Sequence, residues 1–381
     1  MKEIKFNIPY CRDSHLDSFK KVIKNKKFAG NLIFSKKCQT FLKKKFNFKN
    51  ILLTDSCSSS FEIIAETLKK FNTYDVLMSS YNYPTVASAF IKRGFNIKFI
   101  DTNKDDPRIN KEDFLKKLNN NSKIIIITHH AGQAEDIDFF LSLKKEKNFI
   151  LIEDAAQVIN LKFKGKYLGN FGDFSTLSFH ETKNVHCGLG GALVFKYPKY
   201  KKKIIQIWER GTNRSLKTNQ INVKKYEWTE LGSNYYPSEF QSCFLYDQLK
   251  DINLIKKKRK ILFNYYIEKF SRFKLDGDNN LTLMQYSLPS NYHMFYILVK
   301  NGRIRSKLIN FLNKRNIQCV VHYQPLHNSI YSRKKKLKID HCKNTVQFAN
   351  RILRLPMHTY LEKRDLSKIV TIIDQFFKKS V

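Results

Sequence analysis

The chain has 381 residues, of which 42% are hydrophobic, so it is long and apolar enough for a folded protein of two domains and is not disordered. Its 70 Lys and Arg outnumber 33 Asp and Glu, which gives a formal net charge of +37. Because the lysines are spread along the whole chain without a nucleic-acid motif, we interpret the excess as compositional bias that can also attract anionic substrates. A specific nucleic-acid function is not expected.

The apolar runs are short and the cysteines are scattered. The longest runs, such as 124–127 and 149–152, fall far below the ~20 residues that cross a bilayer, and the N-terminus has no hydrophobic signal core. The seven cysteines are odd in number and lack the paired spacing of metal sites. We therefore expect a cytoplasmic protein with reduced thiols, no membrane span and no metal.

In the first half of the chain, short apolar runs alternate with amphipathic stretches. This rhythm is typical of βαβ units and predicts a mostly parallel sheet with helices on both faces, the α/β class. Strands are predicted at 51–54, 76–79, 97–100, 124–128 and 149–152, and helices at 58–71, 85–93, 111–118 and 137–147. The later runs 174–179 and 192–195 have no helix between them, so we expect antiparallel strands there.

The second half predicts a smaller α+β domain. Pro237 to about Phe270 is interpreted as one long helix that links a large domain of residues 1–245 to a small domain of residues 246–381. Further strands are predicted at 293–299 and 317–322, and helices at 306–314, 342–353 and 365–377. The segment 333–336 is expected to be a mobile charged loop.

Two charged residues stand at the ends of apolar runs. Asp154 follows the run 149–152, which places its carboxylate at the carboxyl end of a strand, where open α/β sheets bind ligands. Lys183 follows the run 174–179 and precedes the glycine-rich turn 188–191. In so basic a chain a single lysine is usually a solvated surface charge, so spacing alone does not single out Lys183.

The serine-rich stretch 56–60 follows one predicted strand and opens a helix. Free backbone N–H groups and the helix dipole at such a point suit a phosphate group. A plain serine N-cap explains the same residues and is, taken alone, the more common interpretation.

Seven short motifs occur in an order that resembles the DegT/DnrJ/EryC1/StrS sugar aminotransferases. They are Thr54-Asp55-Ser56-Cys57-Ser58, Ser80-Tyr81-Asn82-Tyr83, His130-Ala131-Gly132, Glu153-Asp154-Ala155-Ala156-Gln157, Ser178-Phe179-His180-Glu181-Thr182-Lys183-Asn184, Gly211-Thr212-Asn213-Arg214 and His322-Tyr323-Gln324-Pro325-Leu326-His327. The resemblance runs from about Phe28 to near the C-terminus. It implies the fold type I of PLP-dependent transferases, with pyridoxal 5'-phosphate (PLP) as cofactor.

The resemblance also implies roles for individual residues. Lys183 would hold the cofactor aldehyde, and Asp154 would face the pyridine nitrogen and keep it protonated. The other implied cofactor contacts are Ser58, Ser59 and Ser178 on the phosphate, Tyr83 stacked on the ring, Gln157 on the 3-hydroxyl side, and Asn234 reaching the neighbouring subunit's cofactor phosphate. The implied sugar-nucleotide contacts are Arg214, His322, Tyr323 and His327. A homodimer with shared active sites follows from the role of Asn234.

Within the family, the motifs are most similar to the enzymes that form dTDP-4-amino-4,6-dideoxygalactose. We therefore expect transfer of an amino group, with glutamate as the implied donor, to carbon 4 of a dTDP-4-keto-6-deoxyhexose in surface-polysaccharide biosynthesis. The family's dehydratases carry histidine where this chain has Lys183, which favours transamination. Leu189 stands where family members commonly have glutamate, so amination at carbon 3 and a PLP-binding regulatory pseudo-enzyme stay open as alternatives.

Overall fold

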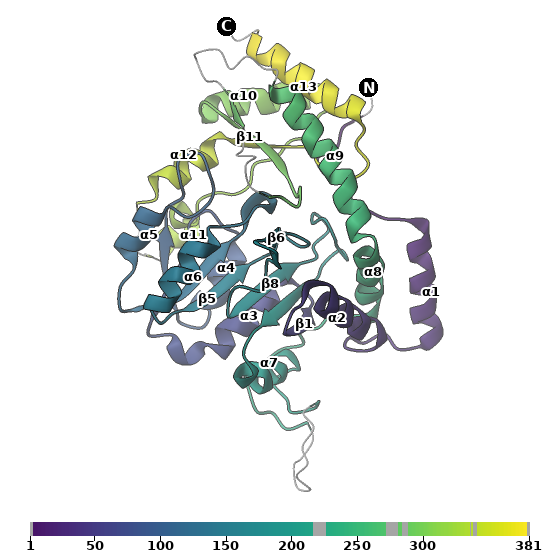
Figure 1. The fold of residues 1–381 in the computed structure, drawn as a ribbon, viewed down its shortest axis with the longest axis vertical. Coiled ribbons are helices and arrows are strands. Elements are labelled where there is room, and N and C mark those ends of the chain that lie inside the picture. The colour runs from purple at the N-terminus through teal and green to yellow at the C-terminus, as the bar shows by residue number, and fades with distance from the viewer. Residues whose placement is uncertain are drawn as a thin grey trace.

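A computed structural model of the chain describes residues 3–215, 226–271, 281–283, 289–335, 337 and 341–378. Its centre is a seven-stranded sheet, and a smaller three-stranded sheet lies above it in Figure 1. The strands of the large sheet are, in spatial order, β1 (Asn50–Thr54), β9 (Gly191–Phe195), β8 (Phe174–Ser178), β5 (Ile150–Asp154), β4 (Ser122–Thr128), β2 (Asp75–Ser79) and β3 (Asn96–Ile100).

The strand directions agree with the prediction of a mixed, mostly parallel sheet. From β8 to β3 the neighbouring strands run parallel, whereas β9 is antiparallel to both of its neighbours, β1 and β8. The expected antiparallel pair at 174–179 and 192–195 is thus confirmed. A separate two-stranded hairpin is formed by β6 (Lys162–Phe163) and β7 (Lys166–Tyr167).

Helices cover both faces of this sheet because its central strands are apolar on both sides. In β4, Ile124 and Ile126 belong to one hydrophobic cluster and Ile125 and Ile127 to the other, and all four are fully buried. Burying each side chain contributes about 2 kcal/mol of hydrophobic free energy. One face carries α3 (Cys57–Thr67), α4 (Pro84–Ile91) and α7 (Lys201–Trp208), and the other carries α2 (Ile33–Phe46), α5 (Lys111–Lys117), α6 (Ile137–Glu146) and α8 (Glu239–Lys250).

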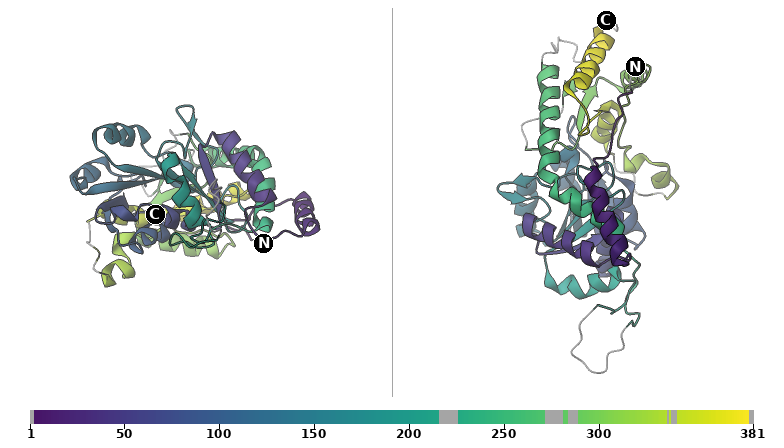
Figure 2. Two further views of the ribbon diagram at one scale, coloured as in Figure 1. Left: turned by 90° about the horizontal axis from the view of Figure 1, so that it is seen from below. Right: turned by 90° about the vertical axis from the view of Figure 1, so that its right-hand side faces the viewer.

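The small domain packs helices against an antiparallel sheet. Its strands are β10 (Leu281–Leu283), β11 (Phe295–Val299) and β12 (Ile352–Leu355), and its helices are α9 (Ile252–Ser271), α10 (Gly302–Asn313), α12 (Lys343–Arg351) and α13 (Lys363–Lys378). Both termini lie at this end of the molecule, as the right-hand view of Figure 2 shows. The N-terminal segment joins the small domain, since Ile4 bridges Ile317 and packs in its core.

The helix expected from Pro237 to Phe270 is in fact two helices, α8 and α9, separated at Asp251. Asp251 ends α8 with φ −85° and ψ 0°, and its carboxylate accepts hydrogen bonds from Tyr10 (3.0 Å) and Arg12 (2.9 Å). These partners lie about 240 residues earlier in the chain, so the break was invisible to local periodicity. The two hydrophobic cores divide within α9, because Ile255 belongs to the large-domain cluster and Leu262 to the small-domain one.

Two further local predictions are wrong. Residues 317–322 form no named strand, and only isolated bridges join Ile317 to Ile4 and Val320 to Arg354. The expected charged loop at 333–336 is helical at its start, because Arg333 and Lys334 end α11 (Ile330–Lys334). The side chain of Ser329 caps that helix by accepting from the N–H of Ser332. The loop prediction relied on the run of charged residues and did not take this N-cap into account. Lys336 lies outside the described residues.

The N-terminal region adds two helices that the sequence pattern did not single out, α1 (Leu16–Asn25) and α2. Val22 of α1 packs with Phe34 of α2 and Cys243 of α8. In the part of the chain that the structure describes, no helix is both long and apolar enough to cross a bilayer. Over the same residues, no group of three or more His, Cys, Asp or Glu side chains is arranged to hold a metal ion.

Candidate active site

Asp154 ends β5 and Lys183 follows β8, two neighbouring strands whose carboxyl ends lie at the same edge of the sheet. β5 and β8 are parallel, with Asp154 opposite Thr176. β8 ends at Ser178, and the chain then turns through Lys183, whose N–H donates to the carbonyl of His180 at 2.8 Å. The carboxyl ends of adjacent parallel strands therefore deliver an acid and an amine to one place, as in other open α/β sheets.

The Asp154 carboxylate is buried and only partly satisfied. Oδ1 accepts from the N–H of Ala156 at 3.1 Å, whereas Oδ2 has only a long 3.5 Å contact with the hydroxyl of Thr128. Burial raises the pKa of Asp154, and the charge of Lys183 opposes that rise. A cationic N–H group placed at Oδ2 would supply the missing partner.

Lys183 is partly buried in the loop after β8. Burial lowers the pKa of its amine to about 8, while Cys57 and Asp154 act in the opposite direction and Arg354 lowers the pKa further. A much larger fraction of this amine is neutral near physiological pH than of an ordinary lysine. A neutral amine is what nucleophilic attack on a carbonyl requires.

The N-terminus of α3 faces the same edge. Ser56 caps the helix by accepting from the N–H of Ser59 at 3.1 Å, while the N–H groups of Cys57 and Ser58 have no acceptor within the helix. Gly191, the first residue of β9, permits this approach, because a Cβ there would lie 2.5 Å from the backbone nitrogen of Cys57. The open N–H groups and the helix dipole make an anion site.

The hydroxyl groups near this helix start already have partners. Ser58 Oγ donates to Thr85 Oγ1 at 2.8 Å, and Ser59 Oγ lies 2.9 Å from Ser56 Oγ. Ser178 is buried at the end of β8, where its Oγ accepts from the N–H of His180 at 3.4 Å. These side chains lie at the carboxyl edge with Asp154 and are held in place before any ligand binds.

Aromatic residues join the two domains above this edge. Tyr83 precedes α4 and is 53% exposed, and its ring lies 5.9 Å from that of Tyr323 in the small domain. The N–H of Tyr323 donates to the hydroxyl of Tyr81 at 2.9 Å. Burial raises the pKa of Tyr323, and the charge of Asp154 adds to the rise. The segment around Tyr323 therefore forms a wall of the Asp154 and Lys183 region.

Three other predicted site residues, Gln157, His327 and His322, make hydrogen bonds to neighbouring protein groups. Gln157 is buried, and its Oε1 accepts from the N–H of Ala131 at 2.9 Å. His327 is buried under the edge with Nδ1 2.5 Å from Ser80 Oγ. His322 is exposed as a residue, but its Nδ1 lies 2.7 Å from Arg354 Nη1, and partial desolvation on that side, with the charge of Arg354, lowers the pKa of His322 to about 4.

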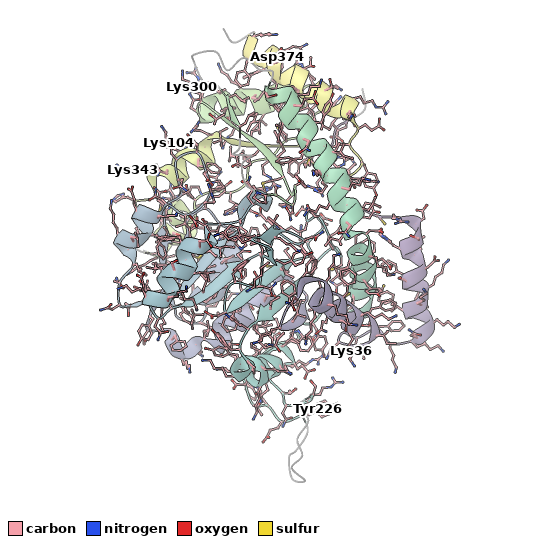
Figure 3. The ribbon with its side chains drawn as sticks, in the orientation of Figure 1. Lys36, Lys104, Tyr226, Lys300, Lys343 and Asp374 are labelled. Carbon is pink, nitrogen blue, oxygen red and sulfur yellow. The ribbon has the colours of Figure 1, made fainter. Side chains whose placement is uncertain are left out.

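Arg214 and Asn234 lie on the segment that follows α7. Arg214 is exposed and sits over the ring of Tyr226 at 5.4 Å, and Figure 3 shows Tyr226 at the end of the molecule opposite the small domain. Asn234 is exposed beside Tyr235, whose carbonyl accepts from the N–H of Asp55 at 2.8 Å. Within one chain, Arg214 is thus not brought to the small-domain side where His322 and Tyr323 lie.

Sequence reasoning missed Arg354 as a site residue. A charged residue inside the apolar run 352–355 was the available signal. Burial raises the pKa of the Cys57 thiol to about 12, which favours the protonated form and a packing role over thiol chemistry.

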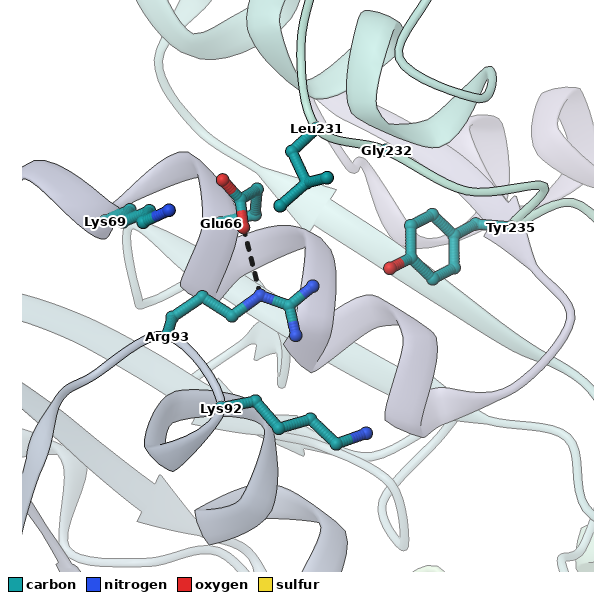
Figure 4. A pocket seen from close by; sticks show the side chains of 7 residues that line it. All are labelled: Glu66, Lys69, Lys92, Arg93, Leu231, Gly232 and Tyr235. Carbon is teal, nitrogen blue, oxygen red and sulfur yellow. Dashed lines mark hydrogen bonds and ion pairs between the residues drawn. The ribbon is translucent and has the colours of Figure 1, made fainter.

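A separate pocket of about 290 Å³ opens on the α3 and α4 side of the large domain (Figure 4). Arg93 forms an ion pair with Glu66 in its wall, with 3.0 Å between Nε and Oε2. The pocket is lined by Glu66, Lys69, Lys92, Arg93, Leu231, Gly232 and Tyr235. It contains neither Asp154 nor Lys183, so we place the chemistry at the sheet edge and not in this pocket.

A family model and two curated proteins match the chain over most of its length. The model of the DegT/DnrJ/EryC1/StrS aminotransferase family matches residues 11–374. The UDP-4-amino-4,6-dideoxy-N-acetyl-beta-L-altrosamine transaminase of Campylobacter jejuni is 27% identical over 365 residues, 92% of each chain. GDP-perosamine synthase of Escherichia coli O157:H7 is 26% identical over 263 residues, 68% of each chain.

Solved structures share the fold at low sequence identity. Helicobacter pylori PseC, an aminotransferase involved in pseudoaminic acid biosynthesis, has a TM-score of 0.89 and 20% identity over 99% of this chain and all of that one. The PLP form of the Streptococcus pneumoniae sugar aminotransferase Spr1654 has a TM-score of 0.89 and 18% identity over both whole chains. A dehydratase, E. coli GDP-4-keto-6-deoxy-D-mannose-3-dehydratase with bound hydrated PLP, also matches, with a TM-score of 0.87 and 18% identity over 97% of this chain and all of that one. The fold by itself therefore does not determine the reaction.

Proposed function

The chain belongs to the DegT/DnrJ/EryC1/StrS aminotransferase family of PLP-dependent nucleotide-sugar aminotransferases, and we propose that it transfers an amino group from L-glutamate to carbon 4 of a dTDP-4-keto-6-deoxyhexose. The observation that carries this proposal is the convergence of Lys183, Asp154 and the N-terminus of α3 at one edge of the sheet. A lysine at position 183 supports transamination over dehydration.

The residues present fit PLP. The underused Oδ2 of Asp154 suits a protonated ring nitrogen, and the amine of Lys183 suits an aldehyde. The N–H groups of Cys57 and Ser58, with the hydroxyls of Ser58, Ser59 and Ser178, suit the phosphate. Tyr83 is proposed to stack on the ring and Gln157 to contact the 3-hydroxyl side. PLP, when bound, withdraws electrons from the carbon that carries the amino group.

Lys183 and Asp154 then have separate tasks. The Asp154 carboxylate would hold a proton on the ring nitrogen through charge-assisted hydrogen bonding. Lys183 would hold the aldehyde carbon of the cofactor. As a free amine it would accept a proton from the donor's α-carbon and return one, a role that its lowered pKa of about 8 favours.

Carbon 4 is supported by the name of one relative. The C. jejuni protein, which covers 92% of this chain, is described as acting on a 4-amino-4,6-dideoxy sugar nucleotide. The names of the two curated relatives carry UDP and GDP, so the nucleotide must be varied in any test. His322, Tyr323 and His327 are proposed to lie along the sugar path, and Arg214 to contact the substrate's diphosphate.

A homodimer with shared sites would explain the segment after α7. Trp228, 77% exposed, and Leu231, 56% exposed, lie on the same segment as Arg214 and Asn234. Large apolar side chains in such exposed positions are typical of surfaces that a partner covers. Under this proposal, Arg214 and Asn234 serve the partner's site. Sedimentation of wild type as a dimer, and of Trp228→Glu as a monomer, is the expected result.

Product analysis tests the function directly. The purified protein should show the visible absorbance of covalently bound PLP, and Lys183→Ala should not. Incubation with glutamate and 4-keto-6-deoxyhexoses carrying dTDP, UDP or GDP should give an amine that NMR places at carbon 4. An equatorial or axial position of the new amine would fix the stereochemistry in the same spectrum.

Other outcomes would reject the proposal. An amine at carbon 3, formed from a 3-keto sugar nucleotide, would replace it with the carbon-3 reaction. A protein that binds PLP but undergoes no half-reaction with glutamate would be a regulatory pseudo-enzyme. A deoxygenated sugar without nitrogen would indicate dehydration. A purified protein without any PLP absorbance would exclude all of these PLP-dependent functions.

A further inference from the structure

Arg354 is a buried cation that has no acidic partner among the residues that the structure describes. It lies in β12 and is only 7% exposed. Nη1 of Arg354 lies 2.7 Å from Nδ1 of His322. The guanidinium lies 5.0 Å from the ring centre of Phe6. Its Nε is buried and has no hydrogen-bond partner. Among the described residues, no Asp or Glu forms an ion pair with it.

Other interior arginines of the chain are better satisfied. Arg259 donates to the backbone carbonyls of Tyr292 and His293. Arg351, three residues before Arg354, pairs with Asp105 and also donates to the carbonyl of Val299 at 2.8 Å. A buried guanidinium that is left unpaired destabilises the fold, and such arrangements are characteristic of functional sites.

Arg354 also lies on the side of the small domain that faces Lys183. Its neighbour His322 is followed directly by Tyr323, whose ring reaches Tyr83 of the large domain. The positive charge of Arg354 lowers the pKa of Lys183, although burial is the larger cause of that shift. The same charge acts on Tyr323, whose pKa it lowers against the effect of burial. The guanidinium is therefore within electrostatic reach of the place where bonds change.

We propose that Arg354 binds a carboxylate of the amino donor, an inference that rests on the proposed aminotransferase function. A guanidinium pairs with a carboxylate through two parallel hydrogen bonds, and its unpartnered Nε is one of the donors that this geometry uses. His322 leaves these donors available, because its Nδ1 accepts from Nη1 alone.

The chemistry of the two substrates favours the amino donor over the sugar nucleotide. In an α-amino acid, the carboxylate is attached to the carbon that reacts, so it must lie close to Lys183. In a nucleotide sugar, the diphosphate is attached at carbon 1, across the ring from carbon 4. A cation whose charge reaches Lys183 is thus better placed for the carboxylate, and the two half-reactions allow this choice to be tested separately.

The experiment compares Arg354→Gln and Arg354→Lys with wild type and with Arg351→Gln as the matched control. Stopped-flow absorbance measures the half-reaction of the PLP enzyme with glutamate, and the second half-reaction is measured with the keto sugar. Arg354→Gln should raise the apparent Kd for glutamate by roughly 10- to 100-fold, the effect of losing a charge-assisted pair. Its Kd for the sugar nucleotide should stay within about twofold, and Arg354→Lys should be intermediate.

A binding measurement that needs no turnover accompanies the kinetics. Glutarate, a dicarboxylate without an amino group, should bind the wild-type PLP enzyme in calorimetry and bind Arg354→Gln at least tenfold more weakly. Melting temperature gives a third readout. A functional role predicts that Arg354→Gln melts at or above the wild-type temperature, because an unpaired buried charge has been removed.

Each result has a defined meaning. An unchanged Kd for glutamate in Arg354→Gln, or a loss confined to the sugar nucleotide, overturns the proposal. A lower melting temperature with equal losses for both substrates assigns Arg354 a structural role and also overturns it. If wild type itself gives no half-reaction with glutamate, the proposed function fails, an outcome that is distinct from an active wild type with an unaffected Arg354→Gln.

Discussion

The imidazole of His129 and the carboxylate of Glu153 form a fully buried pair, with 3.1 Å between Nε2 and Oε2. His129 Nδ1 accepts the N–H of Glu135 at 3.0 Å, so Nε2 is the nitrogen that carries the proton toward Glu153. Glu153 also accepts the backbone N–H groups of Phe171 and Gly172, both at 2.6 Å. This network fixes the end of β5 immediately before Asp154.

Replacing Glu153 by Gln should destabilise the protein by about 2–4 kcal/mol, because a buried amide cannot accept all the N–H groups that the carboxylate now accepts. Chemical denaturation measures the change in the free energy of unfolding. Glu112→Gln, at an exposed position of α5, is the control and should change it by less than about 0.5 kcal/mol. Equal effects of the two substitutions would contradict the importance of the buried network.

The stability of the cofactor-free enzyme should depend on pH through Lys183. The pKa of this amine is lowered to about 8 in the folded state from its ordinary 10.5, chiefly by burial. Between these values the unfolded chain binds more protons than the folded one, so stability contributed by this group rises with pH from about 8 to 10.5. Urea titrations at several pH values should show this rise in wild type relative to Lys183→Met. Parallel pH profiles of the two proteins would refute it.

Asp154→Asn should retain the fold but slow both half-reactions by on the order of a hundredfold or more. An amide in this position cannot stabilise a protonated ring nitrogen, whereas the buried carboxylate can. Single-turnover absorbance with glutamate measures the effect, and circular dichroism checks the fold. Asp138→Asn, an exposed carboxylate at the start of α6, is the control and should react at the wild-type rate. A variant Asp154→Asn with wild-type rates would exclude this residue from the chemistry.

Gly191→Ala should weaken PLP binding because its Cβ would push against the start of α3. The added atom would lie 2.5 Å from the nitrogen of Cys57 and 2.5 Å from the carbonyl carbon of Ser56, both of which are backbone atoms. Gly188→Ala is the matched control in the same turn. Its φ of +79° strains alanine by about 1 kcal/mol, but nothing lies within 4 Å of the new Cβ.

Equilibrium dialysis of PLP distinguishes the two glycine variants. Gly191→Ala should bind PLP at least tenfold more weakly, whereas Gly188→Ala should lose some stability and keep its affinity. Weakening of the same size in both variants would mean that flexibility of the turn, and not the close approach of β9 to α3, matters for the cofactor.

The strands of the large sheet and the helices α3, α4, α5 and α6 could be predicted because their signals are local, whereas α1, α2 and α7 were not predicted. Alternating apolar runs and amphipathic stretches require only a few neighbouring residues, and burial on both sides gives β4 its unbroken isoleucines. Asp154 and Lys183 each follow an apolar run, but spacing did not distinguish Lys183 from the other lysines, and only the order of the family motifs did. The helix break at Asp251 could not be predicted, because its cause is a set of hydrogen bonds from Tyr10 and Arg12.

The sequence by itself determined an α/β sheet and a short list of candidate site residues, since residue order sets periodicity and motif spacing. Only the tertiary structure decided which of these side chains share an environment. Burial, with a smaller effect of the charge of Arg354, lowers the pKa of Lys183 against the opposing charge of Asp154, and the packing of the small domain leaves Arg354 without an acid among the described residues. Such effects depend on distance and desolvation among residues far apart in the chain, which no local pattern encodes.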